Sequence, residues 1–164
     1  MTGQAPAWQL RRATGDDLGA IMAIENAVFT DDAWSTGNMS SELADRNGYY
    51  LVAFPPGQPE RIEAYAGLRS PRNLPQADIQ TIAVAESARR HGLGRTLMQR
   101  MIAEARDRGA KEIFLEVRAD NPAAQSLYDS LGFEQIAVRP RYYLGGVDAL
   151  IMRLVIPDPR VSVA

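Results

Sequence analysis

A short basic and glycine-rich segment, RRHGLG at residues 89–94, constrains this 164-residue chain more than any other feature. It follows an apolar, strand-like run at residues 77–84, and it opens a run in which apolar residues recur at helical spacing as far as Gly109. A helix N-terminus presents unpaired N–H groups and the positive end of the helix dipole, and glycines let a ligand approach the backbone closely. The placement of this segment therefore predicts a site that binds phosphate groups.

The spacing of the glycines separates this loop from two common nucleotide-binding loops. No Lys-Ser or Lys-Thr pair follows Gly94, as a Walker A motif requires, and the spacing differs from the G-x-G-x-x-G of dinucleotide-binding folds. ATP and NAD are therefore disfavoured as ligands. The alternative without any ligand is that Gly92 and Gly94 only permit a tight turn from strand to helix, while both arginines are solvated.

Composition and charge narrow the class of protein further. The length fits one domain, residues 1–164, with residues 157–164 as a loose tail because Pro157 and Pro159 end the last strand. A net charge of −2 and a pI near 5.4 lack the basic surplus of a dedicated nucleic-acid binder. The chain has no cysteine and no apolar run of membrane-spanning length, and its first residues lack the basic and apolar segments typical of a signal peptide. We therefore expect a cytoplasmic protein without disulfides, a nucleic-acid partner or a membrane partner.

Apolar periodicity predicts the element order βαα, then a β-hairpin, then βαβαββ. Strands are expected at residues 8–13, 49–54, 62–68, 77–84, 113–117, 133–138 and 150–156. Helices are expected after Thr14, whose spacing to Asp17 resembles a capping box, then around residues 39–43 and 93–105, and from Asn121, an N-cap followed by proline. This order predicts an α/β fold with one mixed sheet of about seven strands and helices on both faces.

The loop and the segments after it resemble one family. The pattern Gln/Arg-x-x-Gly-x-Gly/Ala opening a helix after a strand is similar to the pyrophosphate loop of the GCN5-related N-acetyltransferases (GNAT family), with Arg89, Gly92 and Gly94 at its fixed positions. The similarity continues through Leu115-Glu116-Val117-Arg118, Asn121, Ala123-Ala124, Leu127-Tyr128, Leu131-Gly132-Phe133 and Arg141-Tyr142-Tyr143. Together these motifs resemble the bacterial ribosomal-protein alanine N-acetyltransferase branch.

This resemblance implies a mostly antiparallel, twisted sheet with a splay between its fourth and fifth strands. It also implies an enzyme that moves the acetyl group of acetyl-coenzyme A to the N-terminal amine of a protein or peptide, such as a ribosomal protein. Since there is no cysteine to carry the acetyl group, direct attack in a ternary complex is the simpler mechanism.

The resemblance assigns coenzyme binding to the middle of the chain. The backbone of residues 90–95 would hold the pyrophosphate, and the strand at residues 82–84 would pair with the pantetheine arm and polarise the thioester carbonyl through an N–H group. The residues expected at the coenzyme are Ile82, Ala83, Val84, Arg89, Arg90, His91, Gly92, Leu93, Gly94, Arg95, Asn121 and Tyr128. Asn121 serves equally well as a helix N-cap alone. No metal is expected.

Two residues are expected to move protons. Glu116 lies in an otherwise apolar strand, where burial would raise the pKa of its carboxyl toward useful basicity. We therefore predict it as the base for the amine, acting directly or through a water. Pairing with Arg118 is the alternative role, and Asp78 is a second candidate base. Tyr128 matches the family tyrosine that protonates the coenzyme A thiolate, although tyrosines on helices ordinarily serve in packing.

The acceptor is expected between the loop joining the first two helices and the loop before the last strand. The candidates there are Phe29, Trp34, Tyr142 and Tyr143. The chain departs from the branch at residues 29–34 (FTDDAW), which keep the aromatic residues but add acidic ones. Arg139 and Arg141 are interpreted either as attracting acidic peptides or as a solvated basic turn. An acetyltransferase for small amines or lysine side chains remains an alternative, as does a noncatalytic acyl-coenzyme A sensor.

Overall fold

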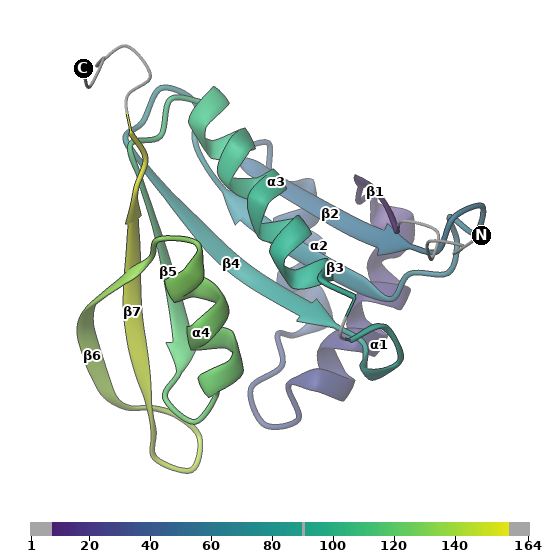
Figure 1. Ribbon diagram of the computed structural model, residues 1–164. Helices are drawn as coiled ribbons and strands as arrows, with labels where there is room; N and C mark the ends of the chain where they lie inside the picture. The colour runs from purple at the N-terminus through teal and green to yellow at the C-terminus, as the bar shows by residue number, and fades with distance from the viewer. Residues whose placement is uncertain (1–7, 90, 158–164) are drawn as a thin grey trace, which may run out of the picture.

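Residues 8–89 and 91–157 are described by a computed structural model, in which seven strands form one open sheet (Figure 1). The strands are β1 (Gln9–Arg12), β2 (Gly48–Phe54), β3 (Ala64–Arg69), β4 (Gln76–Val84), β5 (Glu112–Arg118), β6 (Glu134–Tyr143) and β7 (Val147–Val155). The helices are α1 (Leu18–Val28), α2 (Thr36–Ala44), α3 (Leu93–Asp107) and α4 (Pro122–Ser130), with short 3-10 turns at Gly15–Asp17 and Glu86–Ala88. The predicted element order is confirmed, while residues 158–164, most of the expected tail, lie outside the described residues.

The sheet order is β1-β2-β3-β4-β5-β7-β6, and every neighbouring pair is antiparallel except β4 and β5. These two strands pair in parallel only over Gln76–Asp78 and Glu112–Phe114. Beyond that point β4 continues to Val84 and β5 to Arg118, but the two strands no longer pair with each other, and Figure 1 shows them diverging. The expected splay between the fourth and fifth strands is therefore confirmed.

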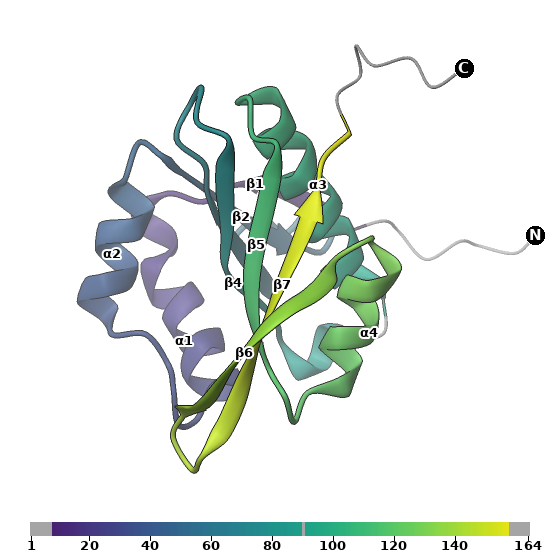
Figure 2. The same cartoon turned by 90° about the vertical axis from the view of Figure 1, so that its left-hand side faces the viewer.

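Helices cover both faces of the sheet, as predicted (Figure 2). On the α3–α4 side the fully buried side chains include Leu68, Leu97, Met98, Met101 and Ile113, and on the α1–α2 side they include Ile21, Met39, Val52 and Tyr65. Burying one such side chain contributes roughly 1.5–3 kcal/mol, so both layers are held to the sheet mainly by apolar contact. Among the helices of the described residues, none combines the length and the apolarity needed to cross a membrane.

Two predicted helix starts form as the sequence indicates. The Thr14 N–H donates to Asp17 Oδ2 at 2.8 Å and the Asp16 N–H donates to Thr14 Oγ1 at 3.3 Å, which completes the capping box before α1. At α4 the Ala124 N–H donates to Asn121 Oδ1 at 3.1 Å, and Pro122 occupies the first turn. Both caps fix the direction in which a helix leaves the sheet.

The sixth strand is longer than the sequence predicts. The prediction ended it at Val138 and left Arg139 and Arg141 in a turn, but β6 runs to Tyr143. The register passes from Arg139 opposite Ala149 to Tyr143 opposite Val147, so residues 140–142 bulge out of the ladder, and Arg141 has a φ of 51°. Pro140 misled the prediction because proline removes a ladder hydrogen bond, yet β6 is an edge strand, where that loss is tolerated.

Candidate active site

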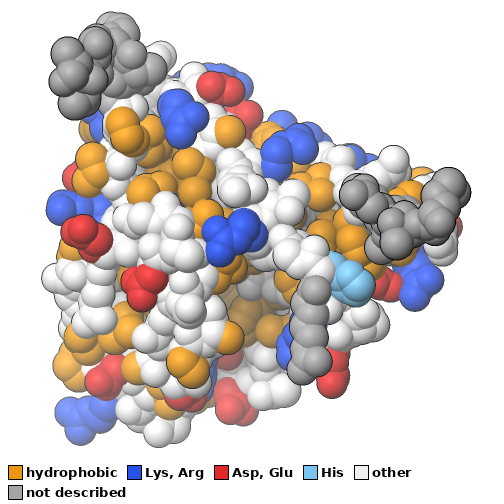
Figure 3. All heavy atoms as spheres, in the orientation of Figure 1, with side chains coloured by type: hydrophobic (Ala, Val, Ile, Leu, Met, Phe, Trp, Pro, Cys, Tyr) orange, Lys and Arg blue, Asp and Glu red, His pale blue; other side chains and the backbone are white. Residues whose placement is uncertain are grey.

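The divergence of β4 and β5 opens a cleft of about 1440 Å³ that reaches both helix layers. On the α3–α4 side it is visible as a hollow between α4 and the end of β4 (Figure 3). The residues predicted for the site that line the cleft are Phe29, Trp34, Ile82, Ala83, Val84, Arg89, Gly92, Leu93, Gly94, Arg95, Glu116, Asn121, Tyr128, Tyr142 and Tyr143. One cleft therefore connects the predicted phosphate loop with the predicted acceptor residues.

The strand β4 contains a bulge where it borders the cleft. Gly67 on β3 is opposite Thr81 and Leu68 is opposite Ile79, so Gln80 has no partner on β3. This bulge reverses the alternation: Ile79 packs in the α3–α4 core, whereas Thr81 lies near Tyr65 in the α1–α2 layer. Because β5 has turned away, no strand of the described chain pairs with this edge of β4 beyond Asp78, and its outward backbone groups face the cleft.

The N-terminus of α3 forms a cradle of backbone donors. Gly92 caps the helix with a φ of 72°, a conformation that favours glycine, and its carbonyl accepts the first helical hydrogen bond, from the Thr96 N–H at 3.1 Å. The N–H groups of residues 93–95 precede that bond, and first-turn N–H groups of this kind can bind an anion. A Cβ on Gly92 would meet no atom within 4 Å, so the space beside the cradle is open. The cradle therefore fits a phosphate-bearing ligand.

The side chains around the cradle each make different contacts. Arg89 Nε donates to the Val84 carbonyl at 3.3 Å and ties the end of β4 to the loop. Arg95 Nη2 donates to Ser130 Oγ at 2.6 Å, which links α3 to α4. His91 is not among the lining residues, and its ring centre lies 5.9 Å from that of Trp8. Arg90, also predicted at the coenzyme, lies outside the described residues.

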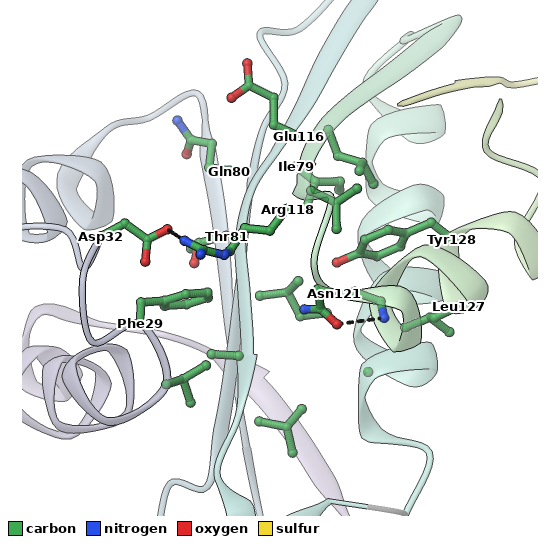
Figure 4. Close-up of a pocket in the computed structure, with 18 of the residues that line it drawn as sticks. Phe29, Asp32, Ile79, Gln80, Thr81, Glu116, Arg118, Asn121, Leu127 and Tyr128 are labelled. Atoms are coloured by element: carbon green, nitrogen blue, oxygen red, sulfur yellow. Dashed lines mark hydrogen bonds and ion pairs between the residues drawn. The ribbon is translucent and has the colours of Figure 1, made fainter. Parts of the chain in front are cut away.

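Tyr128 comes from α4 and is 6% exposed. Its ring packs edge-on against Phe133 with centres 6.0 Å apart, and Figure 4 shows the hydroxyl directed into the cleft near Asn121. Among the described residues this hydroxyl has no hydrogen-bond partner. Burial, with a smaller contribution from Tyr143, raises the pKa of Tyr128 to about 12. The phenol is therefore protonated at neutral pH and has a donor free for a ligand.

Glu116 does not lie where the sequence predicts. We expected a buried, unpaired carboxylate, but the side chain is 32% exposed and forms an ion pair with Arg139 at 3.6 Å. Leu115 and Val117 face the α3–α4 core, so alternation turns Glu116 to the other face. Glu116 pairs with Ile151 on β7, but the splay leaves no strand beside it on the β4 edge. The alternative of pairing with Arg118 is also wrong, because the ion pairs of Arg118 are with Asp32 and Asp120.

Asp78 lines the same cleft from β4. Partial desolvation raises the pKa of its carboxyl, Arg69 opposes this by lowering it, and the charge of Glu116 adds a further rise. Since Ala77 and Ile79 face the α3–α4 core, alternation places Asp78 on the same face of the sheet as Glu116. The two candidate bases are therefore electrostatically coupled on the α1–α2 side.

Aromatic residues from two distant segments line the α1–α2 side of the cleft. Phe29 and Trp34 come from the loop after α1, while Tyr142 and Tyr143 end β6 with their ring centres 5.1 Å apart in an edge-to-face contact. Tyr142 is 51% exposed, and burial raises the pKa of Tyr143 to about 12. Such exposed aromatic faces can hold a peptide chain while their hydroxyls donate to its carbonyls.

One buried acid in this region was not predicted. Glu25 on α1 is 1% exposed and lines the cleft; its Oε2 accepts from the Trp34 N–H at 2.8 Å, and the Tyr65 hydroxyl donates to its Oε1. Burial raises the pKa of Glu25, and the Trp34 hydrogen bond opposes the rise. The signal was present in the sequence, because Glu25 follows Ile21 by four positions and therefore lies on the buried face of the helix.

Within residues 8–89 and 91–157, no group of three or more His, Cys, Asp or Glu side chains is arranged to hold a metal ion.

The comparisons with known proteins point to the same family. The acetyltransferase (GNAT) family profile matches residues 18–133. The N-alpha-acetyltransferase RimI of Mycobacterium tuberculosis is 33% identical over 163 residues, covering 97% of this chain and 99% of that protein. An uncharacterized Mycobacterium leprae protein is 35% identical over 144 residues, but the match spans only 38% of its length. The crystal structure of the Escherichia coli ribosomal-protein-S18-alanine N-acetyltransferase is similar with a TM-score of 0.81 and 30% identity, covering 95% of this chain and 99% of that one.

Proposed function

The chain belongs to the acetyltransferase (GNAT) family, and we propose that it transfers the acetyl group of acetyl-coenzyme A to the α-amine at the N-terminus of a protein. Its similarity to the Mycobacterium tuberculosis and Escherichia coli enzymes supports a protein acceptor, with a ribosomal protein as the first candidate. The observation that carries the proposal is a single cleft with a cradle of backbone donors at one end and paired acidic and aromatic side chains at the other. The lack of cysteine and an acceptor of this kind both fit the cytoplasm.

The α3–α4 side binds the coenzyme in this proposal. The N–H groups of residues 93–95 and the dipole of α3 bind its pyrophosphate, beside Arg89. The unpaired edge of β4 at residues 82–84 binds the pantetheine arm in the manner of an added strand. An N–H group on that edge donates to the thioester carbonyl and stabilises the negative charge that develops on its oxygen. Asn121 contributes at the start of α4 while keeping its cap.

The acetyl transfer needs three events at the cleft. The amine nitrogen attacks the thioester carbon, and Glu116 accepts a proton from that nitrogen directly or through a water. The carbon–sulfur bond then breaks as Tyr128 donates its phenolic proton toward the leaving sulfur. The amide nitrogen keeps the acetyl group and the thiol leaves protonated. Glu116 releases its proton to solvent, and Tyr128 regains one from solvent. Asp78, coupled to Glu116, is the alternative proton acceptor.

The exposed position of Glu116 favours an N-terminal amine over a lysine. At pH 7 deprotonating an α-amine of pKa about 7.7–8.0 costs roughly 1 kcal/mol, whereas a lysine of pKa about 10.4 costs roughly 4–5 kcal/mol. The α-amine therefore needs less help from Glu116, which is partly exposed and forms an ion pair with Arg139.

The test is thiol release from acetyl-coenzyme A with a panel of acceptors: short peptides beginning with Ala, Ser, Thr, Met, Gly or Asp, N-blocked lysine peptides, and polyamines. The wild type is compared with Glu116→Gln. Turnover with free N-terminal peptides, lost in the variant while coenzyme A still binds, supports the proposal. Turnover with lysine peptides or polyamines alone contradicts the proposed acceptor. Coenzyme A binding without turnover on any acceptor would instead favour a noncatalytic sensor.

A further inference from the structure

We propose that Asp32 and Arg118 form a latch across the α1–α2 side of the cleft, and that Asp32 is a positioning residue for the acceptor. The inference deepens the proposed function and depends on it for the identity of the acceptor. It starts from the acidic residues in the α1–α2 loop, which set this chain apart from the branch it resembles and which the reaction steps do not use.

The two walls of the cleft share an apolar core on the α3–α4 side, but few side-chain hydrogen bonds join them. One wall consists of β4, α3 and the α1–α2 loop, and the other consists of β5, α4 and the β6–β7 hairpin. Among the described residues, two side-chain hydrogen bonds connect these walls: Arg95 to Ser130 on the α3–α4 side, and Arg118 to Asp32 on the α1–α2 side. Figure 4 shows the second contact spanning the cleft between the loop and β5. The acceptor enters on this side, so its path passes the latch.

The β5 end of the latch is rigidly held. The Arg118 guanidinium donates to Asp120 at 2.9 and 3.1 Å and lies 5.0 Å from the centre of the Tyr143 ring. Its contact with Asp32 is longer, at 3.5 Å, although both side chains are only about one-fifth exposed, at 23% and 21%. Partial burial weakens salt screening, so the pair is stronger than a fully exposed one. The 3.5 Å contact is nevertheless the longest of the hydrogen bonds that Arg118 makes, so substitution of Asp32 removes it while the bonds to Asp120 remain.

The loop end of the latch carries the acceptor residues. Asp32 lies between Phe29 and Trp34, both of which line the cleft, and the Trp34 N–H is fixed to Glu25. The loop is therefore anchored to its own wall at Trp34 and to the opposite wall at Asp32. Breaking the second anchor frees the segment between Phe29 and Trp34, while the cradle on the other side of the sheet is untouched. Loss of the latch weakens acceptor binding and leaves coenzyme binding unchanged.

The experiment compares Asp32→Asn with Asp31→Asn, which makes the same charge change one residue away. Asp31 is an exposed carboxylate that also lines the cleft but has no ion pair among the described residues, so it controls for the loss of charge alone. KM for the acceptor, KM for acetyl-coenzyme A and kcat are measured at low and high salt. We expect Asp32→Asn to raise the acceptor KM about three- to tenfold, with the acetyl-coenzyme A KM unchanged. Asp31→Asn should stay within about twofold of the wild type, and salt should raise the wild-type KM toward that of Asp32→Asn.

A double-mutant cycle separates the latch from two independent effects. Arg118→Gln alone removes the same contact, so the double variant with Asp32→Asn should be no worse than the poorer single variant. Additive losses, equal KM values for Asp31→Asn and Asp32→Asn, or a rise in the acetyl-coenzyme A KM would each overturn the latch.

Amide hydrogen exchange over residues 29–35 tests the latch without turnover. Exchange should be faster in Asp32→Asn than in Asp31→Asn and the wild type, and equal rates would count against the proposal. An error in the proposed function shows differently, because it appears in the wild type as turnover on another acceptor class or on none.

Discussion

The two sides of the cleft are built from different parts of the chain and by different means. On the α3–α4 side, the cradle consists of backbone N–H groups from one continuous segment, residues 92–95, beside the unpaired edge of β4. On the α1–α2 side, the site consists of side chains from α1, the α1–α2 loop, β4, β5 and β6, joined by ion pairs such as Glu116 to Arg139. A ligand shared by a whole family can be bound by the fold itself, whereas the acceptor is bound by groups that substitution changes freely.

The largest expected effect concerns Tyr128 and tests whether the chemical step depends on one side of the cleft alone. Tyr128 enters from α4, between the two sides, and it should serve the leaving group whatever the acceptor. Tyr128→Phe should lower kcat about 100-fold with unchanged coenzyme A affinity, because it removes the donor and leaves the ring packing against Phe133. Rapid-mixing kinetics and calorimetric titration with coenzyme A measure the two quantities. Tyr49→Phe, a buried tyrosine outside the cleft lining, is the control, and equal losses in both variants would rule out a specific role.

The pH dependence of turnover should distinguish the two sides of the cleft, because only the acceptor changes its charge near neutral pH. The kcat/KM for a peptide acceptor should rise about 20-fold from pH 6.5 to 8.5 as an α-amine of pKa about 7.7–8.0 loses its proton. The acetyl-coenzyme A KM should stay flat, since its binding groups are backbone. Because the pKa values of Tyr128 and Tyr143 are both about 12, no alkaline loss is expected below about pH 10. A rate that climbs without a plateau toward pH 10 would indicate a lysine acceptor instead.

A substitution in the cradle should affect coenzyme binding on the α3–α4 side of the cleft. Gly92 has a φ of 72°, so Gly92→Ala strains the backbone that aims the N–H groups and places a methyl group in the open space beside them. The acetyl-coenzyme A KM should rise about tenfold, and unfolding should become easier by about 1 kcal/mol. Gly57→Ala is the matched control, because Gly57 has a φ of 76° and lies in the β2–β3 turn away from the cleft. It should lose similar stability without changing any KM.

The smallest expected effect concerns the buried anchor of the α1–α2 loop. Burial raises the pKa of Glu25, so the folded protein holds its proton more tightly than the unfolded chain does. The stability that Glu25 contributes is fully present below its unfolded pKa of about 4.3 and is lost as the pH rises through the folded pKa. Thermal unfolding should therefore show the Tm of Glu25→Gln increasing relative to wild type between pH 4 and pH 8. An opposite trend, or the same trend in the exposed control Glu60→Gln, would refute this.

The comparison also explains how much the sequence could predict. The cradle was predictable because Arg89, Gly92 and Gly94 are close in sequence and their placement between a strand and a helix dictates their geometry. The splay was available only through the family resemblance, since no local pattern shows that β4 and β5 part after three paired residues. Arg141 was assigned to a turn because the tolerance of an edge strand for Pro140 is a property of the finished sheet.

The surroundings of the acceptor residues were the least predictable. Glu116 was expected to be buried because its neighbours are apolar, but its exposure also depends on the strands on both sides of β5, and the splay removes β4 from one of them. Glu116 pairs with Arg139, and Arg118 pairs with Asp32 across the cleft. In both pairs the two residues come from segments distant in sequence. Such pairs follow from the tertiary structure and leave no spacing in the sequence to detect.

The central claim is that this cleft brings an acetyl thioester from one side of the sheet to an N-terminal amine on the other. The most direct test is one peptide that carries both a free α-amine and an internal lysine, incubated with the protein and acetyl-coenzyme A near pH 7.5. Fragmentation mass spectrometry then locates the acetyl group. The account predicts that it is on the α-amine, and that Tyr128→Phe greatly slows its appearance. An acetyl group found only on the lysine, or appearing equally fast without the protein, would contradict the account.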